Sequence, residues 1–276
     1  MKSICLSLGA GGARGLAHIV ILEAFEELGI QPTVISGSSI GAIIGAAYAA
    51  GFSTKEMKAT LHEKVISKSG KFWEIFKSLD LVKLLDFVDI ETNAGGFIKG
   101  DKFLGFFADE LKVKTFEELK IPFKVVATNF LTKEQSVFDE GELFLPIKAS
   151  YSLPGLFTPV NINNQLYVDG GLVNPLPYDI FTEKCDITIA VDVQSNFNIK
   201  ALSELPKAYE VFFNAFQIMQ KSIIHEKLKL SQPDILIKTD IRDVRALEFM
   251  KADSIFERSY VYKEELKKKL DKLMDN

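Results

Sequence analysis

Apolar residues alternate between short β-branched runs and longer stretches with helical spacing along much of this chain. Residues 4–8 are apolar enough for a buried strand, residues 16–28 carry apolar side chains at helical spacing, and Gly29 follows them before the next apolar run, residues 33–35. A strand, a helix and a second strand in this order predict a βαβ unit, in which the two strands are parallel.

The same alternation continues to the end of the chain. Further strands are predicted at residues 123–129, 136–139, 166–168, 187–193 and 235–238, and helices at 42–50, 205–230 and 258–274. This order predicts an α/β fold of three layers, a doubly wound and mostly parallel sheet with helices on both faces. Because no repeat, low-complexity segment or linker interrupts it, we expect one domain over residues 1–276, with a core at 2–195 and a C-terminal strand and helices at 196–276.

Residues 55–111 depart from the alternation and are expected to form a helical, cap-like insertion. Within them four lysines lie near an apolar helical face: Lys64, Lys68, Lys71 and Lys77, beside Phe72, Trp73, Ile75, Phe76 and Leu79. A basic amphipathic helix can lie on an anionic membrane or cover a hydrophobic cleft. Packing of this face on the domain core, with the lysines solvated, is the simpler interpretation.

Composition narrows the class of partner. The 276 residues carry a formal net charge of −4, and no basic or aromatic-basic stripe resembles a nucleic-acid site, so we expect no nucleic-acid partner. Phenylalanine is abundant, with 22 residues against one tryptophan, which suits either a deep apolar pocket or a core rich in phenylalanine.

The two cysteines and the N-terminus bear on location. Cys5 and Cys185 lie in apolar stretches without a CxxC pair, so we expect buried free thiols in a reducing compartment rather than a disulfide or a zinc site. No run reaches the roughly 18 apolar residues of a membrane span. Residues 1–8 run into a glycine turn without a signal-peptide cleavage region, and we expect a protein that is cytoplasmic or is exported by a route that needs no Sec signal.

A Gly-x-Ser-x-Gly pattern follows the second predicted strand. It reads Gly37-Ser38-Ser39-Ile40-Gly41 and runs into a helix of small residues. In that setting the pattern is typical of a nucleophile elbow, a sharp turn that exposes one serine oxygen. A side chain at Gly37 or Gly41 would crowd the neighbouring strand or helix, and Ser39 is the candidate nucleophile.

A glycine-rich turn follows the first predicted strand, at residues 9–15 (Gly-Ala-Gly-Gly-Ala-Arg-Gly). Its last glycine comes one position too late for a dinucleotide fingerprint, and it lacks the Gly-Lys-Ser/Thr ending of a phosphate-binding Walker loop. An oxyanion hole needs only free N–H donors close to the nucleophile. Since parallel strands end at the same edge of a sheet, this turn can face Ser39.

A serine nucleophile needs a base, for which the chain offers histidines and one well-placed acid. His18 lies one turn into the helix after the glycine loop, whereas His62 and His225 lie in charged helical stretches. Asp169 ends an apolar strand and precedes Gly170 and Gly171, which would let the carboxylate project while the backbone passes close to another element. Asp169 is the favoured base, with a triad through His225 as the alternative.

Together the three segments resemble the patatin-like phospholipases. That family has a glycine-rich oxyanion loop with Arg or Lys before its last glycine, a Gly-x-Ser-x-Gly elbow, and an Asp-Gly-Gly or Asp-Gly-Ala that carries the second catalytic residue. Residues 149–160 also look like the family's segment before the catalytic Asp, and the resemblance covers about residues 2–195 well. Ala10 is a departure, since many members have glycine there.

The resemblance implies a serine lipid acyl hydrolase of the phospholipase A, lysophospholipase or esterase type. Ser39 would be the nucleophile and Asp169 the general base of a dyad; the N–H groups of Gly11 and Gly12 would form the oxyanion hole, with Arg14 supporting that loop. The reaction would pass through an acyl-enzyme and need no metal or cofactor.

Several alternatives stay open at this point. A catalytically weak or inactive lipid-binding or regulatory protein could keep the same fold, and a nucleotide-binding domain is the remotest alternative. The acyl-chain length, the head group and the oligomeric state do not follow from the sequence, and the expected partner is a lipid or acyl ester, with peripheral contact to a membrane surface allowed.

Overall fold

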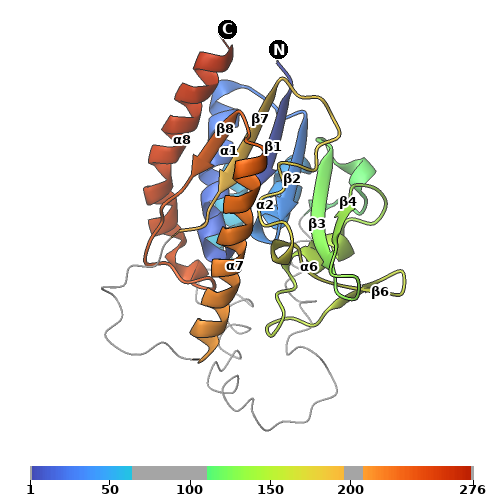
Figure 1. Ribbon diagram of the computed structural model, residues 1–276. Coiled ribbons are helices and arrows are strands. Elements are labelled where there is room, and N and C mark those ends of the chain that lie inside the picture. Colours follow the sequence, from blue (N-terminus) through green and yellow to red (C-terminus); the bar gives the residue numbers. More distant parts are fainter. Residues whose placement is uncertain (1, 64–110, 196–207, 275–276) are drawn as a thin grey trace.

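A central sheet with helices on both faces organises the protein (Figure 1). The computed structural model describes residues 2–63, 111–195 and 208–274. Following its strand pairs, the eight-stranded sheet runs β5-β6-β3-β2-β1-β7-β8, and β4 also pairs with β3. The strands are β1 (Ile4–Leu8), β2 (Val34–Ser38), β3 (Phe123–Asn129), β4 (Gln135–Phe138), β5 (Val160–Ile162), β6 (Gln165–Asp169), β7 (Ile187–Asp192) and β8 (Ile235–Lys238). The five successive strands β3, β2, β1, β7 and β8 pair in parallel, as predicted.

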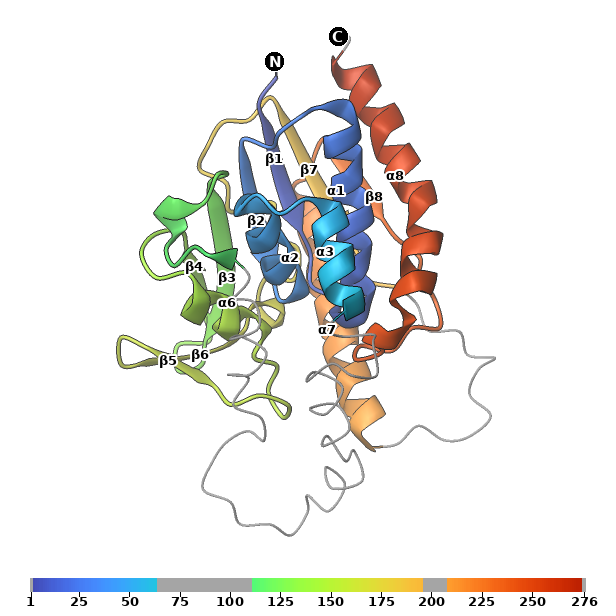
Figure 2. The ribbon, with the colours of Figure 1, turned by 180° about the vertical axis from the view of Figure 1, so that it is seen from behind.

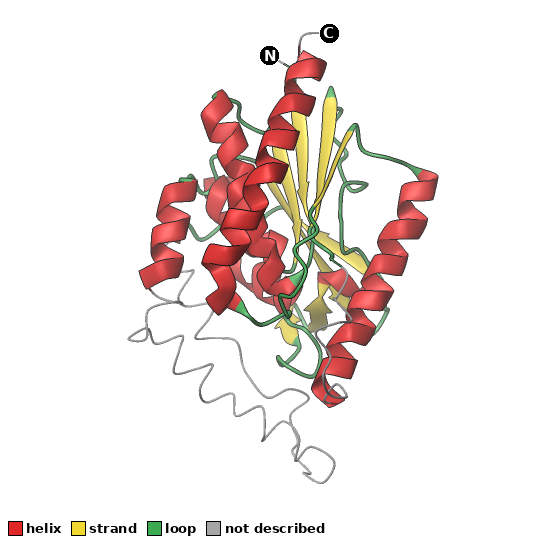
Figure 3. Ribbon diagram, turned by 90° about the vertical axis from the view of Figure 1, so that its left-hand side faces the viewer, coloured by secondary structure: helices red, strands yellow, loops and turns green. Residues whose placement is uncertain are grey.

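The helices complete the three layers expected from the sequence (Figures 2 and 3). One face carries α1 (Ala17–Leu28), α2 (Ile40–Ala49), α3 (Thr54–Leu61), α6 (Phe144–Tyr151) and α8 (Ala252–Met274), and the other carries α7 (Ala208–Leu230). Leu6, Ile35 and Ile189 on the sheet and Leu22 and Phe25 of α1 are fully buried in one continuous core. The doubly wound, mostly parallel fold is therefore confirmed.

The differences from the predicted elements are local. β2 continues three residues past the predicted end because Ser36, Gly37 and Ser38 pair with neighbouring strands despite their small or polar side chains. α8 begins six residues earlier than predicted, after a 3₁₀ turn at Phe249–Lys251. β5 and α6 were not predicted, since a three-residue strand and an eight-residue helix are too short to show a clear period.

β3 holds two other strands end to end along one of its edges. β4 pairs with residues 125–128 of β3, whereas β2 pairs with residues 123–126 and β6 with residues 127–129. Because β4 overlaps both of the others, β2 and β6 must share the opposite edge. Ser38 of β2 is opposite Val126, and Asp169 of β6 is opposite the next residue, Ala127. The last residues of two strands far apart in sequence thus meet.

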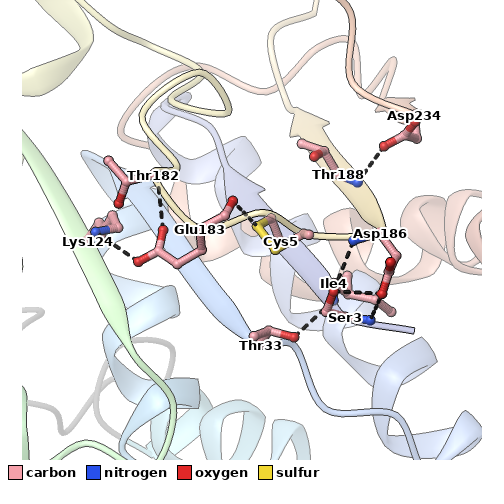
Figure 4. The surroundings of a disulfide bond; sticks show 11 residues. Ser3, Ile4, Cys5, Thr33, Lys124, Thr182, Glu183, Asp186, Thr188 and Asp234 are labelled. Atoms are coloured by element: carbon pink, nitrogen blue, oxygen red, sulfur yellow. Dashed lines mark hydrogen bonds and ion pairs between the residues drawn. A yellow bond between two sulfur atoms is a disulfide. The ribbon is translucent and has the colours of Figure 1, made fainter. Parts of the chain in front are cut away.

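The two cysteines correct the sequence-based expectation of free thiols, because Cys5 of β1 and Cys185 form a disulfide (Figure 4). The bond joins β1 to the segment that enters β7, across a sequence separation of 180 residues. In the same region the Asp186 carboxylate accepts hydrogen bonds from Ser3 N and Ser3 Oγ, both at 2.7 Å. The sheet register between β1 and β7 brings the two cysteines together, which spacing along the chain does not reveal.

Two further expectations concern the membrane. In the described ranges, no helix has both the length and the apolar character needed to cross a bilayer. Of the expected cap-like insertion at 55–111, the structure describes α3 and the residues beside the gap, whereas the basic amphipathic stretch from Lys64 to Leu79 lies outside the described residues.

We expect Cys185→Ala to lower the free energy of unfolding in buffer without reductant by about 2–4 kcal/mol, because it frees a long loop in the unfolded chain. Denaturant titrations of both proteins measure this loss, and excess reductant should make the two curves coincide. Two alkylatable thiols in the unfolded, unreduced wild-type protein would contradict the disulfide.

Candidate active site

Ser39 occupies a sharp turn between β2 and α2. Its φ of 55° and ψ of −121° are rare for a residue with a side chain, and such backbone strain is found mainly at functional sites. Glycine is required on both sides, as the sequence predicts. A Cβ on Gly37 would lie 2.5 Å from the Gly41 carbonyl oxygen, and one on Gly41 would lie 2.1 Å from the Leu8 carbonyl oxygen in β1.

The Ser39 hydroxyl is paired with a carboxylate. Its Oγ donates a hydrogen bond to Asp169 Oδ2 at 2.8 Å, while its backbone N–H donates to Ser150 Oγ of α6 at 2.9 Å. Ser39 itself is half-buried, whereas Ser150 is fully buried. Ser150 thus fixes the backbone of the turn, and the Ser39 hydroxyl points to Asp169.

Asp169 is almost completely buried at the end of β6. Its Oδ1 accepts from Gly171 N at 2.7 Å, so both carboxylate oxygens have donors. Its backbone is fixed as well, since Thr128 Oγ1 donates to the Asp169 carbonyl oxygen at 2.7 Å and Asp169 N donates to the Ser152 carbonyl oxygen at 3.0 Å. Burial raises the pKa of Asp169 from 3.8 to about 7, against the lowering effect of the hydrogen bonds from Ser39 and Gly171.

The two glycines after Asp169 allow close approach, as expected. A Cβ on Gly170 would lie 2.1 Å from the Val126 carbonyl oxygen of β3. One on Gly171 would lie 2.3 Å from Gln220 Nε2 of α7 and 3.2 Å from Ala10 Cβ. The Asp-Gly-Gly turn therefore lies against the glycine loop and against α7.

Among the described residues, two backbone amides of the glycine loop find no acceptor. Ala10 N donates to the Pro175 carbonyl oxygen at 2.8 Å, and Ala13 N donates to the Ala246 carbonyl oxygen at 2.7 Å. Between them, Gly11 N and Gly12 N donate to no acceptor within the part of the chain that the structure describes. Gly12 has a φ of 59°, and a Cβ there would lie 2.4 Å from the Ala246 carbonyl oxygen. Free N–H groups in this loop can stabilise negative charge.

Arg14 belongs to the C-terminal part of the glycine loop, which forms a 3₁₀ turn, Gly12–Leu16, before α1. Its side chain is 1% exposed and donates from Nη1 to Gln217 Oε1 of α7 at 3.3 Å. Burial lowers the pKa of Arg14, partly offset by the nearby Glu248 carboxylate. Arg14 thus links the loop to α7, and it makes no hydrogen bond to Asp169 or Ser39.

None of the three histidines is bonded to Ser39. His18 is fully buried and its Nε2 lies 2.8 Å from the Gly9 carbonyl oxygen, so Nε2 carries the proton; burial lowers its pKa to about 4. His62 pairs with Asp253, with 2.9 Å between Nε2 and Oδ1, and His225 is exposed on α7. The triad through His225 is not the arrangement found around Ser39, whose hydroxyl partner is Asp169.

Some residues of the site were not predicted. Ser150 lies in the segment 149–160, and the resemblance of this segment to the patatin-like family was the one feature of the sequence that could have pointed to it. Thr128 and Gln220 carry no local signal, because a single polar residue near a strand end or on a helix is common.

A serine at a strained strand-to-helix turn is the arrangement typical of α/β hydrolases with a nucleophile elbow, and here a buried carboxylate is the hydrogen-bond partner of the serine. A sequence model described as Patatin-like phospholipase matches residues 6–182, and the chain belongs to this family.

Individual proteins agree with this assignment. The chain is 34% identical to an uncharacterized NTE family protein of Mycobacterium tuberculosis over 194 residues, which cover 70% of this chain and 49% of that protein. It is 30% identical to lysophospholipase NTE1 of Cryptococcus neoformans over 257 residues, covering 91% of this chain and 15% of that protein. The chain thus spans about half the length of the first relative and much less of the second.

A solved structure shows the same fold. VipD from Legionella pneumophila aligns with a TM-score of 0.53 and 15% sequence identity, covering 97% of this chain and 66% of that one. At this identity the likeness concerns the fold alone.

The burial of Asp169 predicts a pH-dependent stability. Between about pH 4 and pH 7 the folded protein holds a proton on Asp169 that the unfolded chain has released, so raising the pH across this window destabilises the fold. Asp169→Asn lacks this ionisation and should gain stability relative to wild type as the pH rises, by up to about 1.4 kcal/mol per pH unit. Urea titrations at several pH values measure the difference.

Asp271→Asn, on an exposed position of α8, is the matched control and should run parallel to wild type. A constant difference between Asp169→Asn and wild type over the same window would show that the Asp169 carboxyl is not destabilised by burial.

Proposed function

We propose that this protein hydrolyses fatty acyl esters of lipids by acyl transfer through Ser39 and Asp169. The observation that carries the proposal is the 2.8 Å hydrogen bond from Ser39 Oγ to Asp169 Oδ2, made by a serine at a strained elbow. Membership of the patatin-like phospholipase family supports the same chemistry.

In the first step Asp169 accepts the Ser39 proton while Ser39 Oγ attacks the ester carbonyl carbon. The tetrahedral intermediate collapses as Asp169 returns the proton to the departing alcohol oxygen, which leaves an acyl-enzyme. Water then attacks the acyl carbonyl carbon while Asp169 takes its proton. Asp169 returns this proton to Ser39 Oγ as the bond between Ser39 Oγ and the acyl carbon breaks, which releases the fatty acid and restores the free serine. An ordinary aspartate is too weak a base for this work, and a pKa near 7 brings the group into the useful range.

The negative charge on the tetrahedral intermediate needs donors that are already in place. The Gly11 and Gly12 amides, which have no acceptor in the part of the chain that the structure describes, support this role, since donors that need not reorganise stabilise an oxyanion most effectively. The N-terminus of α2, which begins directly after Ser39, adds a favourable dipole.

The substrate class is proposed from the relatives together with the site. One relative named lysophospholipase NTE1 aligns with most of this chain, which supports a lipid ester as substrate. Lysophospholipids are therefore the first substrates to test, beside diacyl phospholipids and p-nitrophenyl acyl esters.

Ser39→Ala is expected to lower ester hydrolysis by at least about a thousandfold and to abolish labelling by a fluorophosphonate probe, because the nucleophilic oxygen is gone. Ser38→Ala is the matched control: Ser38 is adjacent, fully buried and has an Oγ without a partner in the described ranges. It should keep both labelling and hydrolysis.

Full activity in Ser39→Ala would overturn the proposal. Binding of fatty acid by wild-type protein that neither reacts with the probe nor hydrolyses any of these esters would instead indicate a lipid-binding protein of the same fold.

The pH dependence of kcat/KM should report the Asp169 base. Because only the ionised carboxylate can accept the Ser39 proton, kcat/KM should rise about tenfold per pH unit below about pH 7 and level off above it. In Asp169→Asn the residual rate should lose this inflection. A wild-type profile that is flat between pH 5 and pH 8 would argue against Asp169 as the base.

A further inference from the structure

The carbonyl of Ala10, in the middle of the glycine loop, has a side-chain donor. Gln194 Nε2 donates to the Ala10 carbonyl oxygen at 3.0 Å and also to Gln220 Oε1 of α7 at 2.8 Å. Both glutamines are buried, with 6% and 8% of their surface exposed. Two buried amides therefore form a chain that ends on the loop.

The orientation of both amides follows from chemistry. A backbone carbonyl can only accept, so the Gln194 atom 3.0 Å from it must be the nitrogen. Since that NH₂ group is the donor, the Gln220 atom facing it must be the oxygen. The Gln194 amide cannot turn over without losing both hydrogen bonds.

Gln194 is itself held in place just beyond the end of β7. Its backbone N–H donates to Asp192 Oδ1 at 2.9 Å, and Asp192 is 2% exposed. Gln220 comes from α7, on the opposite face of the sheet from α1 and α2 (Figures 1 and 2), and lies against Gly171. The chain of amides thus connects β7, α7 and the turn after Asp169 to the glycine loop.

The peptide bond between Ala10 and Gly11 transmits this constraint. All peptide bonds in the described residues are trans, so the Ala10 C=O and the Gly11 N–H point in opposite directions from one rigid plane. A donor that fixes the carbonyl therefore fixes the direction of the N–H. Gly11 has no side chain that could restrain this plane, and its N–H has no acceptor in the described ranges.

We propose that Gln194 is a positioning residue that aims the Gly11 N–H at the oxyanion, and that Gln220 holds the Gln194 amide in the required orientation. This inference rests on the proposed acyl-transfer function. Without Gln194, the Ala10–Gly11 peptide plane can rotate, and one of the two oxyanion donors is no longer in place when charge develops.

Gln194→Met, which keeps the length and bulk of the side chain without a donor, tests this inference. We expect kcat to fall by about 10- to 100-fold with KM changed less than about twofold, because the lost interaction is made only in the transition state. Gln220→Met should cause a smaller loss of about threefold to tenfold. Gln135→Met on β4, whose side chain bonds Asn174, is the control and should match wild type.

A trifluoromethyl ketone with a ¹³C-labelled carbonyl allows the stabilisation of an oxyanion to be measured directly, and looser packing alone would not change this quantity. Ser39 adds to this carbonyl, and the ¹³C shift reports the pKa of the resulting hemiketal hydroxyl. In Gln194→Met that pKa should rise by about one unit for each tenfold lost in kcat, with a smaller rise in Gln220→Met. If Gln194→Met does not fold, Gln220→Met and its hemiketal pKa serve as the test.

The outcomes separate the two proposals. In one outcome the wild-type protein forms the Ser39 adduct, and the folded variants show the same hemiketal pKa and the same kcat for ester hydrolysis. This result would overturn the role of Gln194 and leave the acyl-transfer proposal standing. A wild-type protein that forms no Ser39 adduct and hydrolyses no ester would overturn both.

Discussion

The register of β3 is the constraint on which the candidate site depends. One edge of this strand pairs first with β2 and then, one residue further on, with β6, so that Ser38 and Asp169 lie opposite Val126 and Ala127. Ser39, the next residue after β2, therefore comes within hydrogen-bond distance of a carboxylate 130 positions away in sequence. A slip of one residue in either pairing would turn the corresponding side chain to the other face of the sheet and separate the pair.

Two unfavourable features are concentrated at this point. The backbone of Ser39 is in a sparsely populated conformation, of a kind that costs on the order of 1–3 kcal/mol, and the Asp169 carboxyl is buried, which disfavours its charged form. The elements that flank Ser39, β2 and α2, share one buried hydrophobic core with β1 and α1, which holds the strained turn in place. For the proposed reaction each is useful, since the strain exposes a hydroxyl and the burial makes a carboxylate more basic.

The glycine loop is held by hydrogen bonds to some of its backbone groups, and these bonds do not use the N–H groups of its two central glycines. His18 bonds the Gly9 carbonyl, Gln194 bonds the Ala10 carbonyl and Pro175 accepts from the Ala10 amide, so the loop is held mainly from outside its two central glycines. The contact with the Gly9 carbonyl explains why a histidine is buried at this position. These bonds involve the groups on either side of the two central glycines, so that, within the described residues, the Gly11 and Gly12 amides remain available for a ligand.

Local pattern by itself determined the parallel α/β class and the boundaries of β1, β3 and β8, because periodicity and turn residues act within a few positions. Ser39 and Asp169 were chosen as candidates from their turn residues together with the resemblance to the patatin-like family, and the structure brings their side chains into hydrogen-bond contact. Only the tertiary structure decided which cysteines meet, which residue bonds the Ser39 amide, and what holds the Ala10 carbonyl. Cys5 with Cys185, Ser150 and Gln194 each depend on strand order and register, and these follow from the packing of the whole sheet rather than from any short segment.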